Sequence, residues 1–194
     1  MCKETIILAS QSPRRRELLT MAGLPFEVHV PDVDESCNLP AGEAVAELSR
    51  RKAAACLPEY GGRFILAADT LVCLGKESLG KPHSEEEAVH MLRALSGKTH
   101  VVYSGLSVIA PDRTIRTAVD STEVSFCCIP NSEILSYVAS GEPLDKAGAY
   151  AAQGRASLWI TGINGSFSSV IGLPMLLTRK LLLEAGYPLL SAWA

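Results

Sequence analysis

The sequence predicts one α/β domain that spans residues 1–194. Two observations predict this fold class. Short apolar runs with the composition of strands alternate with segments of helical periodicity, and no linker, repeat or low-complexity segment interrupts the alternation. A chain of 194 residues can bury about 70% of the surface that it exposes when unfolded, so it can fold without disulfides or a structural metal.

The first third of the chain predicts three strands and two helices. The strands are expected at 5–9, 26–30 and 64–74, and the helices at 13–22 and 43–57. Pro13 suits the first helical position after a Ser12 cap, and Gly23 closes that helix. Pro58 and Gly61-Gly62 are expected to end the second helix. The pair Asp69-Thr70 interrupts an otherwise apolar third strand.

The remainder predicts further helices and a long hairpin. Helices are expected at 84–95, 131–139 and about 174–184, and strands at 100–110, 114–127, 159–163 and 169–171. The first of these helices is amphipathic, because its apolar residues recur at i, i+3, i+4 and i+7. Pro111-Asp112-Arg113 separates the two long strands, which favours a hairpin.

Composition excludes several classes of function. The formal charge is −3, from 18 Lys and Arg against 21 Asp and Glu, so no basic field attracts nucleic acid. No stretch approaches the roughly 20 apolar residues of a membrane span, and the N-terminal run is too short for a secretory signal. The six cysteines form no C-x-x-C pair and are interpreted as reduced, mostly buried cytosolic thiols: Cys2, Cys37, Cys56, Cys73, Cys127 and Cys128. We therefore expect a cytoplasmic protein with no membrane partner.

The first candidate site is the predicted start of the helix at Pro13. Ser10 precedes it, and Arg14, Arg15 and Arg16 lie in its first turn. Free backbone N–H groups at a helix start attract anions, and guanidinium groups can bind phosphate oxygens in pairs. The residues thus indicate phosphate binding, and the alternative is a helix start whose arginines lie in solvent.

The second candidate is Asp69. A carboxylate within a buried strand is costly unless it is paired, hydrogen-bonded or bound to metal. Ligands of open α/β sheets gather at the carboxyl ends of strands, which makes Asp69 a candidate metal ligand or general base; the alternative is a buried aspartate that caps a turn. Asp32, Asp34 and Glu35 form an acidic cluster that is either a further source of oxygen ligands or a solvated loop.

Two glycine-rich segments need separate treatment. Residues 75–81 fit the first seven positions of a phosphate-binding P-loop, but Pro82 replaces the hydroxyl residue that binds magnesium. We expect a hairpin turn there, with Lys81 as a single charge within reach of a phosphate. In the small-residue segment 141–154, the amide of Gln153 can pair with a base edge; the alternative is a surface loop.

Taken together, these segments resemble the Maf family of nucleotide pyrophosphatases, also called septum-formation inhibitors. The shared elements, in order, are LASQSPRR at 8–15 with ELL at 17–19, RKA at 51–53, ADT at 68–70, GKP at 80–82, LSG at 95–97 with His100, DKAGAY at 145–150 with Gln153-Gly154, and GLP at 172–174. The resemblance covers nearly the whole chain. It implies a twisted mixed sheet with flanking helices around a central cleft, similar to inosine triphosphatases, and a homodimer.

The same resemblance implies residue roles. Asp69 is the catalytic acidic residue, and Glu35 is a second acidic group that with Asp69 holds a divalent cation, Mg²⁺ or Mn²⁺. Phosphates are expected to meet Ser10, Arg14, Arg15, Lys52 and Lys81. In the branch that prefers dTTP and UTP, the positions that tune base choice match Arg14, Thr70 and Gln153.

The resemblance leads to a specific reaction. We expect hydrolysis of dTTP or UTP to the monophosphate and pyrophosphate. An ordinary aspartate, with a pKa of about 3.9, is a weak base at neutral pH, so the metal is expected to acidify the attacking water while Asp69 orients it. Two alternatives remain: a non-catalytic regulator of cell division that senses nucleotides, and the same chemistry on a modified purine nucleotide.

Overall fold

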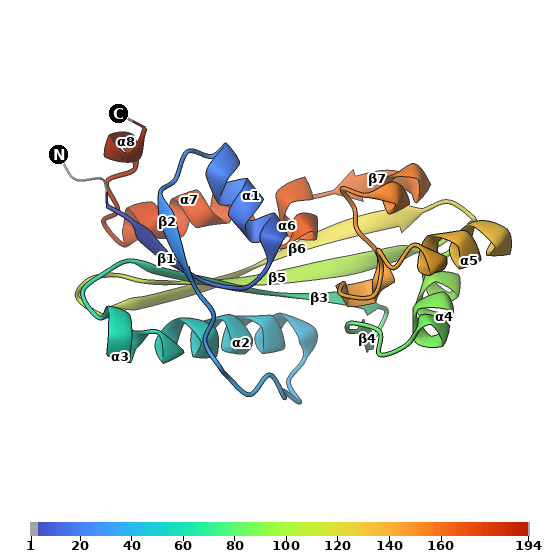
Figure 1. The fold of residues 1–194 in the computed structure, drawn as a ribbon, viewed down its shortest axis with the longest axis horizontal. Coiled ribbons are helices and arrows are strands. Elements are labelled where there is room, and N and C mark those ends of the chain that lie inside the picture. Colours follow the sequence, from blue (N-terminus) through green and yellow to red (C-terminus); the bar gives the residue numbers. More distant parts are fainter. Residues whose placement is uncertain (1–3, 194) are drawn as a thin grey trace. The chain divides into compact units, whose positions relative to one another are not determined.

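The computed structural model describes residues 4–193, which form a mixed seven-stranded sheet with flanking helices (Figure 1). The strand order is β2-β1-β3-β5-β6-β7, and β4 pairs with β3. The strands are β1 (Ile6–Ala9), β2 (Phe26–His29), β3 (Ile65–Leu74), β4 (Glu77–Leu79), β5 (Thr99–Ile109), β6 (Ile115–Phe126) and β7 (Ile160–Asn164). The main helices are α1 (Pro13–Met21), α2 (Ala41–Ala55), α3 (Leu57–Tyr60), α4 (Glu85–Leu95), α5 (Asn131–Ala139), α6 (Phe167–Ile171), α7 (Met175–Glu184) and α8 (Leu189–Ala192). The predicted α/β class is confirmed.

The predicted end of α2 at Pro58 is wrong. Helix α2 ends at Ala55, and Pro58 lies in the first turn of the separate short helix α3. Proline lacks a backbone N–H, but the first turn of a helix has no intrahelical partner for those groups. Pro58 therefore opens a helix instead of closing one.

The strand predicted at 169–171 is also wrong, because these residues belong to helix α6. The carbonyl of Ser166 accepts the N–H groups of Ser169 at 3.0 Å and Val170 at 3.3 Å. A serine after Gly165 thus starts a helical turn, which is a common role of serine at helix N-termini. The apolar residues at 170–171 are too few to distinguish a strand from such a turn.

The strand predicted at 64–74 is confirmed as β3, which carries Asp69-Thr70 as a polar break in its apolar pattern. Asp69 lies in the middle of the strand, not at its carboxyl end, and is 8% exposed. After β3, Gly75 with φ 61° and Lys76 form a tight turn into β4, where Leu74 pairs with Glu77. The hairpin turn predicted in place of a P-loop is confirmed.

By its contacts the chain divides into two compact units. The first unit comprises 1–69, 104–120 and 172–194, and the second comprises 70–103 and 121–171. In the first unit, parallel pairing joins β1 to β2 and to β3. Alternate residues of β1 and β3 face opposite sides: Ile6, Leu8, Leu66 and Ala68 pack with α1 and α7, whereas Ile7, Ala9, Ile65 and Ala67 pack with α2.

The second unit has a core of its own, formed by α4, α5, parts of the strands and the segment 147–159. In α4 the four predicted apolar residues are buried, and the Ser84 hydroxyl caps the helix by accepting the N–H of Glu87 at 3.2 Å. The surface-loop alternative for 141–154 is not observed throughout, because residues 148–152 are buried. Gly148, with φ 68°, packs so closely against Val72 that a Cβ would lie 2.9 Å from its Cγ1.

Two composition-based expectations can be compared with the structure. None of the helices within residues 4–193 is long and apolar enough to cross a membrane. Of the described cysteines, all are free, Cys56 and Cys73 are buried, Cys37 and Cys127 are partly buried, and Cys128 is exposed. The expectation of mostly buried thiols is thus met by two of these five, and Cys2 lies outside the described residues.

Candidate active site

Asp69 is paired with a lysine from helix α2. By the alternation of β3, Asp69 lies on the same face as Ile65 and Ala67, the face that packs with α2. Lys52 Nζ lies 2.6 Å from Asp69 Oδ1, and the side chains of both residues are 12% exposed. The partner that a carboxylate requires in a buried strand is therefore a cation seventeen residues away in the chain.

The same ammonium group joins Asp69 to Glu35. Lys52 Nζ lies 2.7 Å from Glu35 Oε1, whose side chain is 60% exposed. Two carboxylates from different segments thus converge on a single positive charge. Asp69 uses Oδ1 in this ion pair, so its other oxygen, Oδ2, remains outside it.

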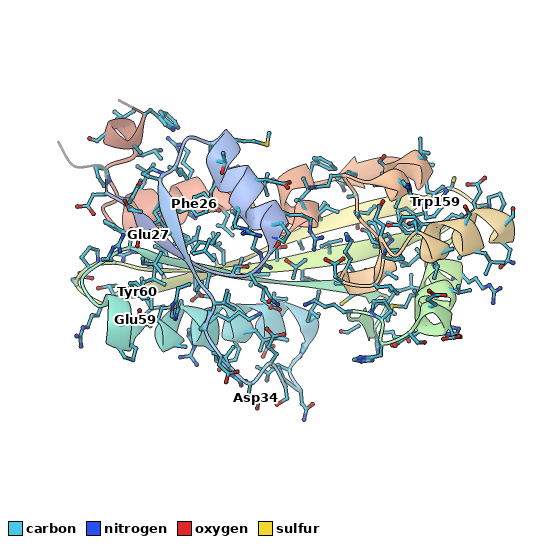
Figure 2. All side chains as sticks on the ribbon, in the orientation of Figure 1. Phe26, Glu27, Asp34, Glu59, Tyr60 and Trp159 are labelled. Carbon is cyan, nitrogen blue, oxygen red and sulfur yellow. The ribbon has the colours of Figure 1, made fainter. Side chains whose placement is uncertain are left out.

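The loop that carries Glu35 is held against α2 by Arg51. Its guanidinium donates to the carbonyl oxygens of Ser36 at 3.0 Å and Asp34 at 3.4 Å, and to Glu47 at 2.8 Å. Asp34, labelled in Figure 2, accepts both the N–H and the hydroxyl of Ser36, which lowers the pKa of its carboxyl. Asp34 therefore shapes the loop. The shared RKA segment contained Arg51, but nothing in the sequence indicated this role.

Ser10 and Arg15 form the second part of the site. Arg15 Nη1 donates to Ser10 Oγ at 3.0 Å, and the N–H of Ser12 donates to the same oxygen at 3.2 Å. Arg15 Nε donates to the carbonyl of Gly172 at 2.8 Å. Arg15 is thus oriented by Ser10, close to it in the sequence, and by Gly172, far from it. The contribution of Gly172 was not predicted from the sequence.

Helix α1 begins with cationic residues and without a side-chain cap. Pro13 occupies the first turn as predicted, but the Ser12 side chain makes no capping hydrogen bond, and the first turn contains no acidic residue. Burial lowers the pKa of Arg15; the carboxylate of Asp69 opposes this shift, neighbouring Arg14 reinforces it, and Glu35 opposes it. A desolvated guanidinium beside another arginine at a helix N-terminus is an environment that an anion stabilises.

The structure thus brings together six of the predicted residues within the first unit: Ser10, Arg14, Arg15, Glu35, Lys52 and Asp69. The other three belong to the second unit. Thr70 is partly buried in β3, Lys81 is exposed after β4, and Gln153 is exposed in the segment before β7.

Two carboxylates at this site, those of Asp69 and Glu35, are candidate oxygen ligands for a cation. Within residues 4–193, no group of three or more His, Cys, Asp and Glu side chains is arranged to hold a metal ion. Mg²⁺ in nucleotide enzymes commonly takes one or two carboxylates and completes its shell with phosphate oxygens and water. Asp69 and Glu35 fit that requirement, since both already contact one positive charge.

Comparison with known proteins identifies the family. Residues 5–185 match the family described as Maf-like protein. The chain belongs to that family. This Maf-like protein is 47% identical over 172 residues to a dTTP/UTP pyrophosphatase of Bacillus cereus (strain AH820), covering 88% of this chain and 90% of that one. It is 47% identical over 188 residues to a dTTP/UTP pyrophosphatase of Myxococcus xanthus, covering 95% and 94% of the two chains.

A third relative has the same name: the dTTP/UTP pyrophosphatase of Desulforamulus reducens is 49% identical over 173 residues, covering 88% of this chain and 91% of that one. Solved structures show the fold of the Maf-like protein. The Ham1 protein of Staphylococcus aureus matches with a TM-score of 0.55 at 14% identity, covering 93% of this chain and 98% of its own. A HAM1 protein from Coxiella burnetii matches with a TM-score of 0.51 at 16% identity and the same coverage.

Proposed function

We propose that this Maf-like protein hydrolyses dTTP or UTP to the nucleoside monophosphate and pyrophosphate. The observation that carries the proposal is the pair of carboxylates, Asp69 and Glu35, joined by Lys52 in the unit that also contains the cationic start of α1. The substrate follows from relatives at 47% identity that are named dTTP/UTP pyrophosphatases. We also propose that the chain acts as one domain, in a cytoplasmic homodimer.

The start of α1 suits the triphosphate. Arg15 is fixed by Ser10 and Gly172, so its position does not need to be ordered when the ligand binds. The Ser10 oxygen accepts in both of its contacts, which leaves its own hydrogen for a phosphate oxygen. Arg14, Arg15 and Lys52 offset a large part of the roughly four negative charges of a triphosphate. Lys81 is assigned to phosphate binding only because the family resemblance implies it.

The carboxylate pair suits a divalent cation, Mg²⁺ or Mn²⁺. Asp69 and Glu35 would hold the ion, and Lys52 already shows that a positive charge is accommodated between them. When bound, such an ion polarises phosphoryl oxygens and acidifies water.

The chain's own residues then perform the reaction. Asp69 accepts a hydrogen bond from the attacking water and orients it toward the α-phosphorus. The water oxygen bonds to that phosphorus and releases one proton to the surrounding water, and the bond from the α-phosphorus to the oxygen bridging to the β-phosphorus breaks. Pyrophosphate leaves with that electron pair, stabilised by the arginines. Thr70, Gln153 and Arg14 are assigned to the choice of base.

Replacement of Asp69 by Asn tests the proposal. The amide keeps the shape of the side chain and an oxygen for Lys52 but loses the charge that orients the water, so pyrophosphate release from dTTP should fall by about a hundredfold or more. Asp112→Asn is the matched control, because Asp112 is exposed in the turn between β5 and β6 and an amide oxygen can still accept the N–H of Thr114. A folded Asp69→Asn variant with the wild-type rate would remove Asp69 from the mechanism.

A further inference from the structure

Gln153 is an exposed residue that directly follows a buried segment. Residues 150–152 are buried, whereas Gln153 is exposed. The N–H of Gly154 donates to the carbonyl of Ala151 at 3.0 Å, which closes a tight turn around Gln153. The turn is therefore a compact unit whose orientation depends on what contacts its two sides.

On the first side, the turn is held by Tyr137 of helix α5. The N–H of Ala151 donates to Tyr137 Oη at 3.1 Å. Tyr137 is 3% exposed, and burial raises the pKa of its phenol, so the hydroxyl keeps its proton. That proton is donated to Glu142 Oε1 at 3.0 Å. One hydroxyl group thus accepts from the turn and donates to a carboxylate.

On the second side, the turn is held by Glu142 itself. Its Oε1 accepts the N–H of Arg155 at 3.0 Å, in addition to the hydroxyl of Tyr137. Gly154 passes so close that a Cβ there would lie 2.1 Å from Oε1 and 2.8 Å from Cδ of Glu142. The absence of a side chain at Gly154 is what lets the carboxylate reach the backbone.

From these contacts we propose that Tyr137 and Glu142 are positioning residues that set the orientation of the Gln153 amide for base recognition, although neither contacts the nucleotide. The inference rests on the proposed function. Tyr137 accepts the backbone N–H two residues before Gln153, Glu142 accepts the backbone N–H two residues after it, and a hydrogen bond from Tyr137 to Glu142 joins the two supports. An amide presents a donor and an acceptor to a base edge, so its orientation determines which base it fits.

Kinetics of pyrophosphate release from dTTP test this proposal in four single variants. Tyr137→Phe removes only the hydroxyl group. Gly154→Ala displaces the Glu142 carboxylate and leaves the tyrosine side chain at 137 in the sequence. Both should raise KM for dTTP by about two- to tenfold, the equivalent of one net hydrogen bond, while kcat changes by less than about twofold. Glu142→Gln retains an oxygen that accepts both hydrogen bonds, so its KM should match the wild type. Gln153→Ala should raise KM at least as much as Tyr137→Phe.

Double variants separate positioning from a general structural effect. If Tyr137 and Glu142 act through Gln153, then adding Tyr137→Phe or Gly154→Ala to Gln153→Ala should change KM by less than about twofold. Equal increments in both backgrounds, or an unchanged KM in Tyr137→Phe and Gly154→Ala, would overturn the inference while the enzyme remains active. A wild-type protein that releases no pyrophosphate from dTTP or UTP would instead refute the proposed function, and this inference with it.

Discussion

At the level of single residues, the charge of Lys52 compensates two carboxylates, those of Asp69 and Glu35. Lys52→Met removes the group that contacts Asp69 and Glu35 and leaves Asp69, 8% exposed, without its partner. Breaking a buried pair in this way typically costs about 3 kcal/mol or more. We expect urea denaturation to show a loss of that size in the free energy of unfolding.

A second substitution checks the cause of that loss. In the double variant Lys52→Met with Asp69→Asn, the uncompensated charge is gone, so much of the lost stability should return. If the double variant is as unstable as the sum of both single variants, the destabilisation arises from packing of the lysine stem and not from the stranded carboxylate.

His100 makes stability depend on pH. It is 1% exposed, its Nε2 lies 2.8 Å from Tyr150 Oη, and burial lowers its pKa from 6.5 to about 4. Between these values the unfolded chain binds a proton that the folded chain excludes. The contribution of His100 to the free energy of unfolding is therefore fully present above about pH 6.5. It decreases by about 1.4 kcal/mol per pH unit as the pH falls toward 4.

The variant His100→Gln isolates this contribution, since other titrating groups are shared with the wild type. Between pH 6.5 and 5, the wild type should lose about 2 kcal/mol more of its unfolding free energy than the variant. Parallel pH profiles in urea denaturation would mean that His100 is protonated in the folded protein.

At the level of elements, the position of helix α2 depends on a glycine in β5. A Cβ at Gly105 would lie 2.1 Å from the carbonyl oxygen and 2.3 Å from the carbonyl carbon of Val45, which are backbone atoms of α2. Gly105→Ala must therefore shift the helix that carries Lys52. We expect a destabilisation of about 2–3 kcal/mol together with slower pyrophosphate release.

The matched control is Gly162→Ala in β7, where an added Cβ would meet nothing within 4 Å. Both measurements should remain close to the wild type in this variant. A Gly105→Ala protein with an unchanged free energy of unfolding would show that α2 can move away from β5 without loss of stability.

At the level of the whole molecule, three strands link the two compact units. β3, β5 and β6 each contribute residues to the first unit and to the second. Unfolding one unit would remove partners from strands that the other unit also uses, so we expect a single cooperative transition. Fluorescence of Trp159, which is 6% exposed in the core of the second unit and labelled in Figure 2, should change at the same urea concentration as far-ultraviolet circular dichroism. Two separate transitions would contradict a single domain.

The alternation of strands and helices and the residue types of the site could be predicted from the sequence. Periodicity located α4 and its buried face, and the charge within an apolar run drew attention to Asp69, because both signals are local. Short elements with few apolar residues, such as α6, gave no local signal strong enough to separate a strand from a helical turn.

Which groups contact one another depends on the packing of the folded chain. The pairing of Asp69 with Lys52, and the contact of Arg15 with Gly172, 157 residues away, depend on how strands and helices pack. Tyr137 and Glu142 likewise hold the Gln153 turn by accepting backbone N–H groups, and such contacts cannot be predicted from residue types. A buried charge or amide requires a partner because its burial is costly, but the identity of that partner is determined by proximity in space.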